Sequence, residues 1–362
     1  MLRFIQIGTG GMGSAWCNFI LPYLVKELKV ARPVAAVDIN PDVHHNAING
    51  LGLPPEKVYP EARKAFEENE ADFAIIVVPP AFHEQMVDLA LEFNCHILSE
   101  KPVADTMEAC CRIYHKVKRA GKKMSVTMSH RFDQDKQTLE ALIKSGAYGD
   151  LNYIVGRFTH ECRRYPSWGA FRYKIADPLL IEGSVHHFDI LRALTGSNAK
   201  TVFAMTWNPP WSEFAGDSTG LVMMEMENGV RAMYEGAKAN ATTLNGWGHE
   251  YFRAECDKAT LVLENREVKV MSHLGFPYPE SMKVALKKQR KWTNEWLAEL
   301  FVRWVEGGEE PPNSLEDNIQ CCALLFAAIE SSRTGQPVDV QAFLRDHLEK
   351  ASRELDGMSV AN

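Results

Sequence analysis

A glycine-rich loop directly after the first apolar run constrains the fold of this chain more than any other feature. The run Phe4–Ile7 leads into Gly8-Thr9-Gly10-Gly11-Met12-Gly13, and residues 14–21 after it are compatible with a helix. Glycines at this spacing allow a tight turn, a close approach of the backbone to a pyrophosphate, and close packing of helix on strand. The helix N-terminus then offers N–H groups to the anion. The sequence therefore predicts a dinucleotide site formed by Gly8, Gly10, Gly11, Met12 and Gly13.

An aspartate at the end of the second strand-like run indicates which dinucleotide is bound. Asp38 follows Val34–Val37, and no arginine occurs in the next three residues, Ile39-Asn40-Pro41. A carboxylate at this position accepts hydrogen bonds from the ribose hydroxyls, whereas a 2′-phosphate would need an arginine nearby. We therefore expect NAD as the cofactor, with NADP disfavoured.

Short β-branched runs alternate with helical stretches over the first third of the chain. The strand-like runs cover residues 4–7, 34–37, 73–78, 96–98 and 124–127. This alternation predicts a doubly wound parallel sheet. The uninterrupted apolar run Ala74–Val78 suits a central strand that helices cover on both faces. We expect an α/β Rossmann domain that binds NAD over residues 1–125.

The pattern changes after about residue 125. Turn signals such as Glu227-Asn228-Gly229 now separate the strand candidates, which favours a mostly antiparallel sheet. The strand candidates cover 151–160, 202–205, 220–226, 230–234, 260–263 and 268–271, with helical patterns at 135–144, 185–194, 293–305 and 315–334. We expect an α+β domain over residues 126–362 that binds substrate and forms oligomers. A cleft between the domains is expected, and helix 315–334 is the element expected to pack against the Rossmann domain.

Composition narrows the class of protein further. The formal charge of −7 on 362 residues argues against a general nucleic-acid binder, because neutralising phosphates requires a basic surface. No apolar stretch reaches the roughly 18 residues that a membrane-spanning helix needs, and the N-terminus lacks a signal-peptide pattern. A cytoplasmic protein acting on a small molecule is expected. The 8 cysteines show no CxxC spacing and are expected to be reduced.

Further motifs follow the predicted parallel strands. Ser99-Glu100-Lys101-Pro102 comes after the fourth strand, Pro79 and His83 lie upstream of it, and Ser129-His130-Arg131-Phe132 and Gly335-Gln336-Pro337-Val338-Asp339 come later. Together they resemble the Gfo/Idh/MocA family, named for glucose-fructose oxidoreductase and inositol dehydrogenase. A lysine at the C-terminal edge of a parallel strand points into the crevice where nucleotides bind. The resemblance implies Lys101 as a catalytic residue that also contacts cofactor and substrate, a cis bond before Pro102, and cofactor contacts from Pro79, His83 and Glu100.

A second cluster opens the helix predicted over residues 185–194. Glu182, His186 and Asp189 fall on family positions that hold an acid, a histidine four residues on and an aspartate three further on, although the family more often has Asp at the first. Oxidation of a secondary alcohol requires a group with a pKa near 7 to accept the hydroxyl proton, which suits histidine. We expect His186 as general base, Lys101 as the cation that stabilises the alkoxide, and Glu182 as the group that positions the sugar or the imidazole.

Catalysis by Asp189 and metal binding are less favoured by the residues of this cluster. Asp189 is expected to be structural rather than catalytic. A metal site is not expected, because the adjacent histidines have a lone acid neighbour and no second His or Cys cluster.

Substrate contacts are expected from loops of the second domain. Aromatic faces stack on sugar C–H surfaces, and arginines hydrogen-bond hydroxyls or carboxylates. Trp168 and Arg172 match positions that the family uses. The full set of candidates is Arg131, His160, Arg163, Arg164, Tyr165, Trp168, Arg172, Trp247, His249 and Tyr251.

The resemblance implies an NAD-dependent dehydrogenase or reductase that acts on a secondary alcohol or ketone of a sugar, inositol or related polyol. Two alternatives stay open: a glycosidase that uses a transient oxidation by bound NAD, and a non-catalytic NAD- or sugar-sensing protein. Strands between Val202 and Tyr234 carry apolar residues on both sides. A homodimer or homotetramer through the C-terminal sheet is therefore expected.

Overall fold

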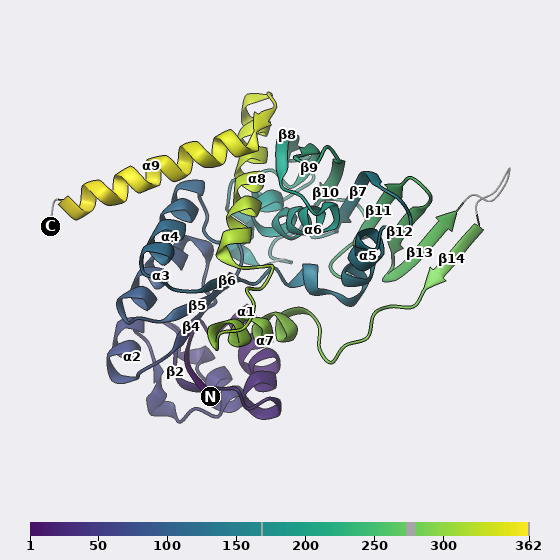
Figure 1. The fold of residues 1–362 in the computed structure, drawn as a ribbon. Helices are drawn as coiled ribbons and strands as arrows, with labels where there is room; N and C mark the ends of the chain where they lie inside the picture. Colours follow the sequence, from purple (N-terminus) through teal and green to yellow (C-terminus); the bar gives the residue numbers. More distant parts are fainter. Residues whose placement is uncertain (168, 273–279, 361–362) are drawn as a thin grey trace. The chain divides into compact units, whose positions relative to one another are not determined.

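The chain folds into two compact units. The computed structural model describes residues 1–167, 169–272 and 280–360 (Figure 1). The first unit comprises Met1–Met128, Lys291–Ile319 and His347–Asn362, and the second comprises Ser129–Arg290 and Gln320–Asp346.

A six-stranded parallel sheet forms the centre of the first unit. The strand order is β3-β2-β1-β4-β5-β6, which is the order of a doubly wound dinucleotide-binding fold. All four residues of β4 are buried, as the continuous apolar run predicts. The predicted parallel sheet is confirmed. The strands are β1 (Leu2–Ile7), β2 (Ala31–Val37), β3 (Val58–Tyr59), β4 (Phe73–Ile76), β5 (His96–Ser99) and β6 (Met124–Val126).

Helices connect these strands. Helix α4 begins at a Thr106 cap, whose hydroxyl accepts a hydrogen bond from the Ala109 N–H at 3.2 Å. It is tied to α3 by the bidentate pair of Arg112 with Glu84, at 2.8 and 2.7 Å. The helices between the strands are α1 (Met12–Ala15), which continues as a π-helical turn to Ile20, α2 (Ala62–Glu68), α3 (His83–Glu92) and α4 (Met107–Arg119).

A segment from the C-terminal third also belongs to the first unit. In α7 (Thr293–Val305) the ring of Phe301 packs edge-on against Phe73 at 5.4 Å, and the Tyr23 hydroxyl donates to Glu299 at 2.5 Å. The expected second domain, residues 126–362, included this helix. The structure differs because the apolar side of α7 is buried against β4 and β5 of the parallel sheet.

The second unit is built on a nine-stranded sheet of order β14-β13-β12-β11-β7-β10-β9-β8-β15. The β7–β10 pair is parallel, and the other pairs in the described part of the chain are antiparallel, which confirms the mostly antiparallel sheet. The strands are β7 (Leu151–Thr159), β8 (Ala199–Trp207), β9 (Thr219–Met226), β10 (Arg231–Ala237), β11 (Tyr251–Cys256), β12 (Thr260–Glu264), β13 (Glu267–Ser272), β14 (Glu280–Val284) and β15 (Val338–Asp339).

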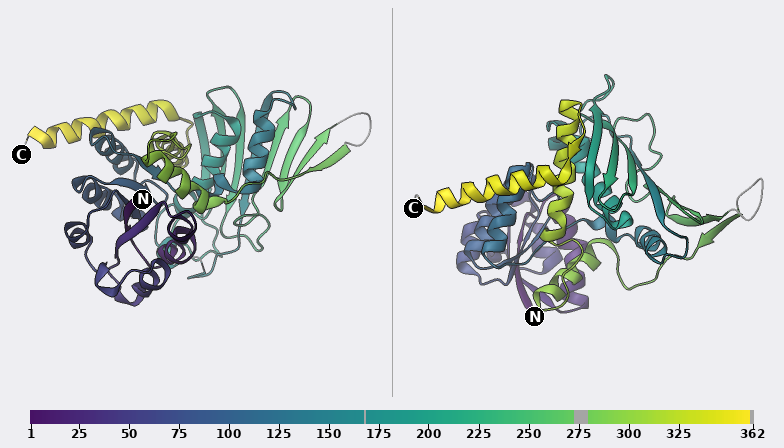
Figure 2. Two further views of the ribbon diagram at one scale, coloured as in Figure 1. Left: turned by 60° about the horizontal axis from the view of Figure 1, so that its bottom comes forward. Right: turned by 45° about the horizontal axis from the view of Figure 1, so that its top comes forward.

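The two faces of this sheet differ. Helices α5 (Gln134–Lys144) and α6 (Val185–Thr195) cover one face (Figures 1 and 2), and every residue of α6 is buried. Along β9, buried residues alternate with exposed or half-buried ones, so one face of the strand joins the core and the other is open. The open face carries large apolar side chains at Met205, Leu221, Met223 and Met233.

Two long helices near the C-terminus belong in part to each unit. Helix α8 (Leu315–Thr334) has the predicted bounds, and the division between the units falls after its Ile319. Just before it, the Asn313 side chain donates to the Val126 carbonyl in the first unit at 2.7 Å. Further along, the Ser331 hydroxyl accepts from the Ala204 N–H in the second unit at 3.0 Å. Helix α9 (Val340–Val360) completes the described chain.

Candidate functional site

The glycine loop at the end of β1 leaves no room for side chains at its two ends. Gly8 has φ +89°, and a Cβ there would lie 2.0 Å from the Val77 carbonyl oxygen. A Cβ at Gly13 would lie 2.3 Å from the Gly8 carbonyl oxygen, whereas one at Gly11, which has φ +50°, would meet no atom within 4 Å. The outer ends of the loop are therefore tightly packed, while its middle is open. This backbone fits a pyrophosphate at the start of a helix.

Asp38 holds this loop in place. Its Oδ2 accepts hydrogen bonds from the backbone N–H groups of Thr9 and Gly10, at 2.7 and 3.1 Å. Its Oδ1 accepts from the Asn40 N–H at 2.9 Å. The carboxylate at the end of β2 thus shapes the glycine loop in addition to the ribose contact that the sequence predicts.

His83 does not fit the predicted direct contact with the cofactor. Its side chain is fully buried at the start of α3, and both ring nitrogens lie within hydrogen-bonding distance of backbone carbonyl oxygens. Nε2 is 2.8 Å from the Val78 oxygen and Nδ1 is 3.0 Å from the Pro102 oxygen. Burial lowers the pKa of the ring. His83 therefore links the loop after β4 to the loop after β5, while the exposed Pro79 beside it lies at the surface.

The loop after β5 carries Glu100 and Lys101. The Lys101–Pro102 bond is cis, as the resemblance implies. Glu100 accepts a hydrogen bond from the Trp16 indole N–H at 2.8 Å, so this carboxylate anchors the turn that follows the glycine loop. Lys101 is half-buried at the C-terminal end of the parallel sheet, and its contact with cofactor and substrate stays a prediction.

In the second unit, the structure brings Glu182 and Arg172 together. Glu182 is buried in a π-helical segment, Pro178–Ser184, that leads into α6, so it precedes the regular helix instead of opening it. Its Oε2 accepts from the Arg172 Nε at 2.9 Å. An acid and an arginine paired in this way present a fixed set of donors and acceptors.

His186 lies one turn further on, in a cluster of aromatic rings. Its imidazole centroid is 4.5 Å from that of His130 and 5.8 Å from that of Trp247. The Lys238 ammonium, which is fully buried, lies 4.2 Å from the centre of the Trp247 ring. Trp247 therefore lies close to both His186, the predicted base, and Lys238, which directly follows strand β10. His130 is a second imidazole beside His186.

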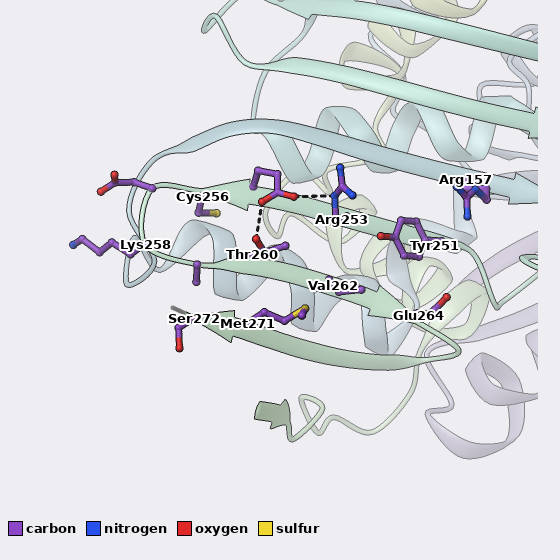
Figure 3. A pocket seen from close by; sticks show the side chains of 13 residues that line it. Arg157, Tyr251, Arg253, Cys256, Lys258, Thr260, Val262, Glu264, Met271 and Ser272 are labelled. Carbon is purple, nitrogen blue, oxygen red and sulfur yellow. Dashed lines mark hydrogen bonds and ion pairs between the residues drawn. The ribbon is translucent and has the colours of Figure 1, made fainter. Parts of the chain in front are cut away.

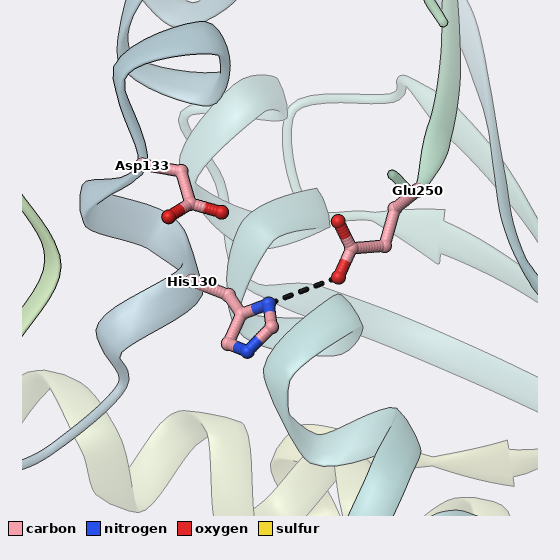
Figure 4. A group of neighbouring side chains, drawn as sticks. All are labelled: His130, Asp133 and Glu250. Carbon is pink, nitrogen blue, oxygen red and sulfur yellow. Dashed lines mark hydrogen bonds and ion pairs between the residues drawn. The ribbon is translucent and has the colours of Figure 1, made fainter. Parts of the chain in front are cut away.

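Glu250 and Lys136 form a buried ionic group beside His130. Glu250 accepts from His130 Nδ1 at 2.9 Å (Figure 4) and from Lys136 Nζ at 2.7 Å. Lys136 also donates to Asp133 at 2.8 Å. Burial alone would raise the pKa of Glu250, but hydrogen bonds from His130 and His187 and the charge of Lys136 hold it well below the usual value.

The donors His130, Asp133 and Glu250 lie close enough together to be considered as metal ligands. However, the ammonium of Lys136 lies within hydrogen-bonding distance of both carboxylates of this group. Burial works against a charged lysine, but Glu250, Asp133 and Asp135 outweigh it and raise the pKa of Lys136. The chain thus supplies its own cation to the acidic pair.

His187 is fully buried, and its ring lies 5.9 Å from that of Trp247. Tyr234 accepts a hydrogen bond from the Ser184 hydroxyl at 3.0 Å, and the Tyr234 oxygen is 2.9 Å from His187 Nδ1. Nε2 of His187 is 3.7 Å from Glu250. Burial lowers the pKa of His187 to about 4, so the ring is neutral in the folded protein at pH 7.

Arg131 and Asp189 form a buried pair, with Nη1 3.4 Å from Oδ1. Arg192, one turn further along α6, approaches the same oxygen at 3.8 Å. Asp189 therefore contacts two guanidinium groups in the interior, a structural placement like the one expected from the sequence. Substrate binding by Arg131 stays a prediction.

The other predicted substrate contacts are dispersed. Tyr165 is exposed and its N–H donates to Glu213, which also pairs with Arg164 at 2.8 Å. Arg163 pairs with Glu161 at 3.1 Å, and His160 stacks at 6.2 Å from Phe158, the ring that also contacts Trp247. His249 is exposed next to the buried Glu250. Trp168 lies outside the described residues.

Tyr251 is on the opposite face of the sheet from α6. Its neighbour Phe252 points into the core beside Leu191 of α6, so by strand alternation Tyr251 points outward. There it lies under the Arg157 guanidinium at 5.3 Å and lines an open hollow of about 790 Å³ (Figure 3). Tyr251 therefore lies on the other face of the sheet from the helix that carries His186, and its contact with substrate stays a prediction.

Sequence reasoning did not assign roles to His130, Lys136 and Glu250. His130 occurs within a recognised motif, Ser129-His130-Arg131-Phe132, but only Arg131 was expected to bind substrate. Glu250 is 120 positions from His130 along the chain, and no spacing rule connects them. Asp133 and Lys136 are three positions apart at the start of α5, a spacing typical of ion pairs on a helix surface. The sequence does not reveal that this pair is buried.

Both parts of the chain match known protein families. Residues 2–128 match a family described as "Oxidoreductase family, NAD-binding Rossmann fold", and residues 140–340 match its "C-terminal alpha/beta domain". Together these matches cover most of the chain.

Similar proteins include one named as an inositol dehydrogenase. The uncharacterized protein y4oX of Sinorhizobium fredii is 43% identical over 97% of this chain and 99% of its own length. The inositol 2-dehydrogenase of Corynebacterium glutamicum is 29% identical over 63% of this chain and 65% of its own. The fold is similar, with a TM-score of 0.81 and 20% identity, to an Agrobacterium radiobacter oxidoreductase solved with NAD+, L-tartaric acid and magnesium, covering 94% of this chain and 99% of that one.

Among the helices of the described residues, none combines the length and the apolar character that crossing a membrane requires.

Proposed function

The chain belongs to the Gfo/Idh/MocA oxidoreductase family, whose first domain is an NAD-binding Rossmann fold, and from this premise we propose that it transfers a hydride between NAD and a secondary alcohol or ketone of a sugar, inositol or related polyol. The observation that carries the substrate class is the His186 cluster, in which a histidine at the start of α6 is surrounded by His130 and Trp247. Aromatic faces and imidazoles of this kind suit the alternating C–H and O–H groups of a polyol. The named inositol dehydrogenase among the relatives supports the same class.

The glycine loop, Asp38 and the loop of Glu100 and Lys101 are the residues that would hold NAD. Bound there, the nicotinamide supplies the hydride acceptor or donor. The loop backbone provides N–H groups to the pyrophosphate, and Asp38 accepts from the ribose hydroxyls. The absence of an arginine in residues 39–41 supports NAD over NADP.

We assign the proton transfer to His186 and the charge stabilisation to Lys101. In the oxidative direction His186 removes the hydroxyl proton, and the Lys101 ammonium stabilises the developing alkoxide. The Glu182–Arg172 pair orients the remaining hydroxyl groups, because the carboxylate accepts and the guanidinium donates. In the reductive direction the same groups work in reverse.

A screen for NADH formation tests this function. Inositols, hexoses, uronic acids and anhydrosugars are each offered with NAD to the wild type, Lys101→Ala and His186→Ala, with the exposed Lys64→Ala as control. We expect one polyol to be oxidised by the wild type and the control, and a loss of at least about 100-fold in kcat in both active-site variants, the scale of general acid–base catalysis. NAD binding without oxidation or reduction of any polyol would favour the glycosidase or sensor alternatives.

We also propose that a second copy of the chain covers the open face of the nine-stranded sheet. Met223 and Met233 are exposed there and line a mainly apolar hollow of about 370 Å³ between β7, β8, β9 and β10. Contiguous apolar surface of this kind marks an interface. Analytical ultracentrifugation should show a dimer or tetramer that Met223→Lys dissociates, and a wild-type monomer at micromolar concentration would contradict the proposal.

A further inference from the structure

His130 is held by a buried carboxylate in a fixed orientation. Its Nδ1 lies 2.9 Å from Oε1 of Glu250, whose side chain is completely buried, whereas 20% of the His130 side chain is exposed. In Figure 4 the Nδ1 edge of the ring points toward Glu250 and the Nε2 edge points away from it. Nδ1 of the ring is therefore held by the buried carboxylate, and Nε2 points away from Glu250.

The hydrogen-bond pattern sets which nitrogen of His130 carries a proton. Lys136 donates to the other oxygen of Glu250 at 2.7 Å, which keeps the carboxylate an acceptor toward His130. A neutral imidazole that donates from Nδ1 has its lone pair on Nε2. Carboxylates orient histidines in this way in many metal and acyl-transfer sites, where the second ring nitrogen binds the metal or transfers a proton.

The second nitrogen belongs to a ring that lies next to the proposed base. The centroids of His130 and His186 are 4.5 Å apart with the planes inclined at 42°, and Trp247 borders both rings. Two imidazoles at this separation can each form a hydrogen bond with one of two hydroxyl groups on adjacent carbon atoms.

We propose that His130, oriented by Glu250, is a second substrate-binding histidine: its Nε2 accepts a hydrogen bond from the hydroxyl next to the one that His186 deprotonates. The substrate is then a polyol with a free hydroxyl adjacent to the carbon that is oxidised. This assignment rests on the proposed function, because it takes His186 as the base.

Ligand binding is tested separately from turnover by nitrogen-15 NMR of the histidine rings. The uniformly labelled full-length protein with NADH is titrated with the same polyol panel, and the His130 signals are identified by their loss in His130→Asn. We expect the ring nitrogen signals of His130 to shift when a polyol binds. A panel in which no polyol shifts His130 overturns the proposal whether or not turnover is seen. A shift without turnover supports polyol binding by His130 but contradicts the proposed function, and with it the place of the bound hydroxyl beside the one that His186 deprotonates.

Kinetics with a paired substrate sharpen the test. Asn at position 130 can still donate to Glu250 but has no group at the Nε2 position, whereas Gln places an amide closer to it. For a substrate that the screen identifies, we expect His130→Asn to lower kcat/KM by about 10- to 100-fold and His130→Gln to recover part of it.

The deoxy analogue that lacks the adjacent hydroxyl gives the specific readout. It should lose a similar factor with the wild type and little more with His130→Asn, because the variant has already lost that contact. Equal losses with wild type and variant, or an unchanged kcat/KM in His130→Asn, would overturn the assignment. A merely structural role would weaken both substrates alike. Melting temperatures and NAD affinity of the variants establish that they are folded.

Discussion

The glycine loop of the first unit and the histidine cluster of the second are both compact, but they are specified differently. In the loop the chemistry lies in the backbone, and close contacts such as Gly8 against Val77 leave no choice of side chain. In the cluster it lies in side chains from three separate stretches of the chain, which meet at Glu250. The loop is thus determined locally and the cluster only by the complete fold. Substitutions in the two regions should therefore fail in different ways.

The largest effect should come from the buried cation of the cluster. Lys136→Met leaves Glu250 and Asp133 uncompensated in the interior, and the free energy of unfolding should fall by about 3–5 kcal/mol. The matched control is Lys144→Met in the same helix, where the pair with Glu140 is exposed on the lysine side and should cost less than about 1 kcal/mol. Urea unfolding measures both. Equal losses would mean that the burial of Lys136 does not matter.

Acidification should weaken the same region next. His187 has a pKa of about 4 in the folded protein, below the ordinary value of about 6.5, so the unfolded state binds more protons between these values. Stability should therefore fall by up to about 3 kcal/mol as the pH drops from 6.5 to 4. Glu250, whose pKa is lowered, contributes its own loss only below about its ordinary value near 4.5.

The variant His187→Asn separates these two contributions. Without the imidazole, the decrease between pH 6.5 and 4 should be mostly absent while the loss at lower pH persists. Unfolding free energies measured across this range check it, and identical profiles for variant and wild type would contradict the assignment to His187.

In the glycine loop, by contrast, binding should suffer more than folding. Gly8→Ala places a Cβ against the Val77 carbonyl in a backbone conformation that favours glycine, and the loop must shift. We expect NAD affinity to fall on the order of 100-fold, or about 2.7 kcal/mol. Gly357→Ala is the control, because a Cβ there meets no atom within 4 Å. Calorimetric titration with NAD measures both, and an unchanged affinity in Gly8→Ala would refute the loop's role.

The smallest effect should arise at Asp38. Asp38→Ala removes the acceptor for the Thr9 and Gly10 N–H groups and the expected ribose contact, which should weaken NAD binding by about 10-fold. NADP binding should change less, since its 2′-phosphate no longer meets a carboxylate. Asp42→Ala, on the exposed turn just after β2, is the control. A variant that keeps the wild-type ratio of NAD to NADP affinity would show that Asp38 does not select the cofactor.

Much of the fold was predictable because its signals are local. The apolar run that includes Phe73–Ile76 indicates a central strand, and the pattern over 315–334 matches α8 in its bounds. The two-residue strands β3 and β15 carry too little pattern to be recognised, because their pairing depends on β2 and β8 beside them. The position of α7 was also not predictable, since its apolar face is compatible with either unit.

The residues of the candidate site also differ in whether local sequence signals could predict them. The glycines, Asp38 and the cis bond at Lys101–Pro102 follow from motif and resemblance. The burial of His83 and the outward side of Tyr251 depend on neighbours that no local pattern encodes. Glu250 contacts His130 across 120 positions, a contact that exists only once the sheet and α5 have assembled.

The position of the Lys136 ammonium has a consequence for the folding of this protein. A cation attached to the chain arrives with the polypeptide itself, at an effective concentration that a free ion in solution does not reach. The acidic pair of Asp133 and Glu250 therefore has a cation beside it as soon as α5 docks on its sheet, with no loading step and no competition among ions. Chelators added during purification should leave this part of the molecule intact.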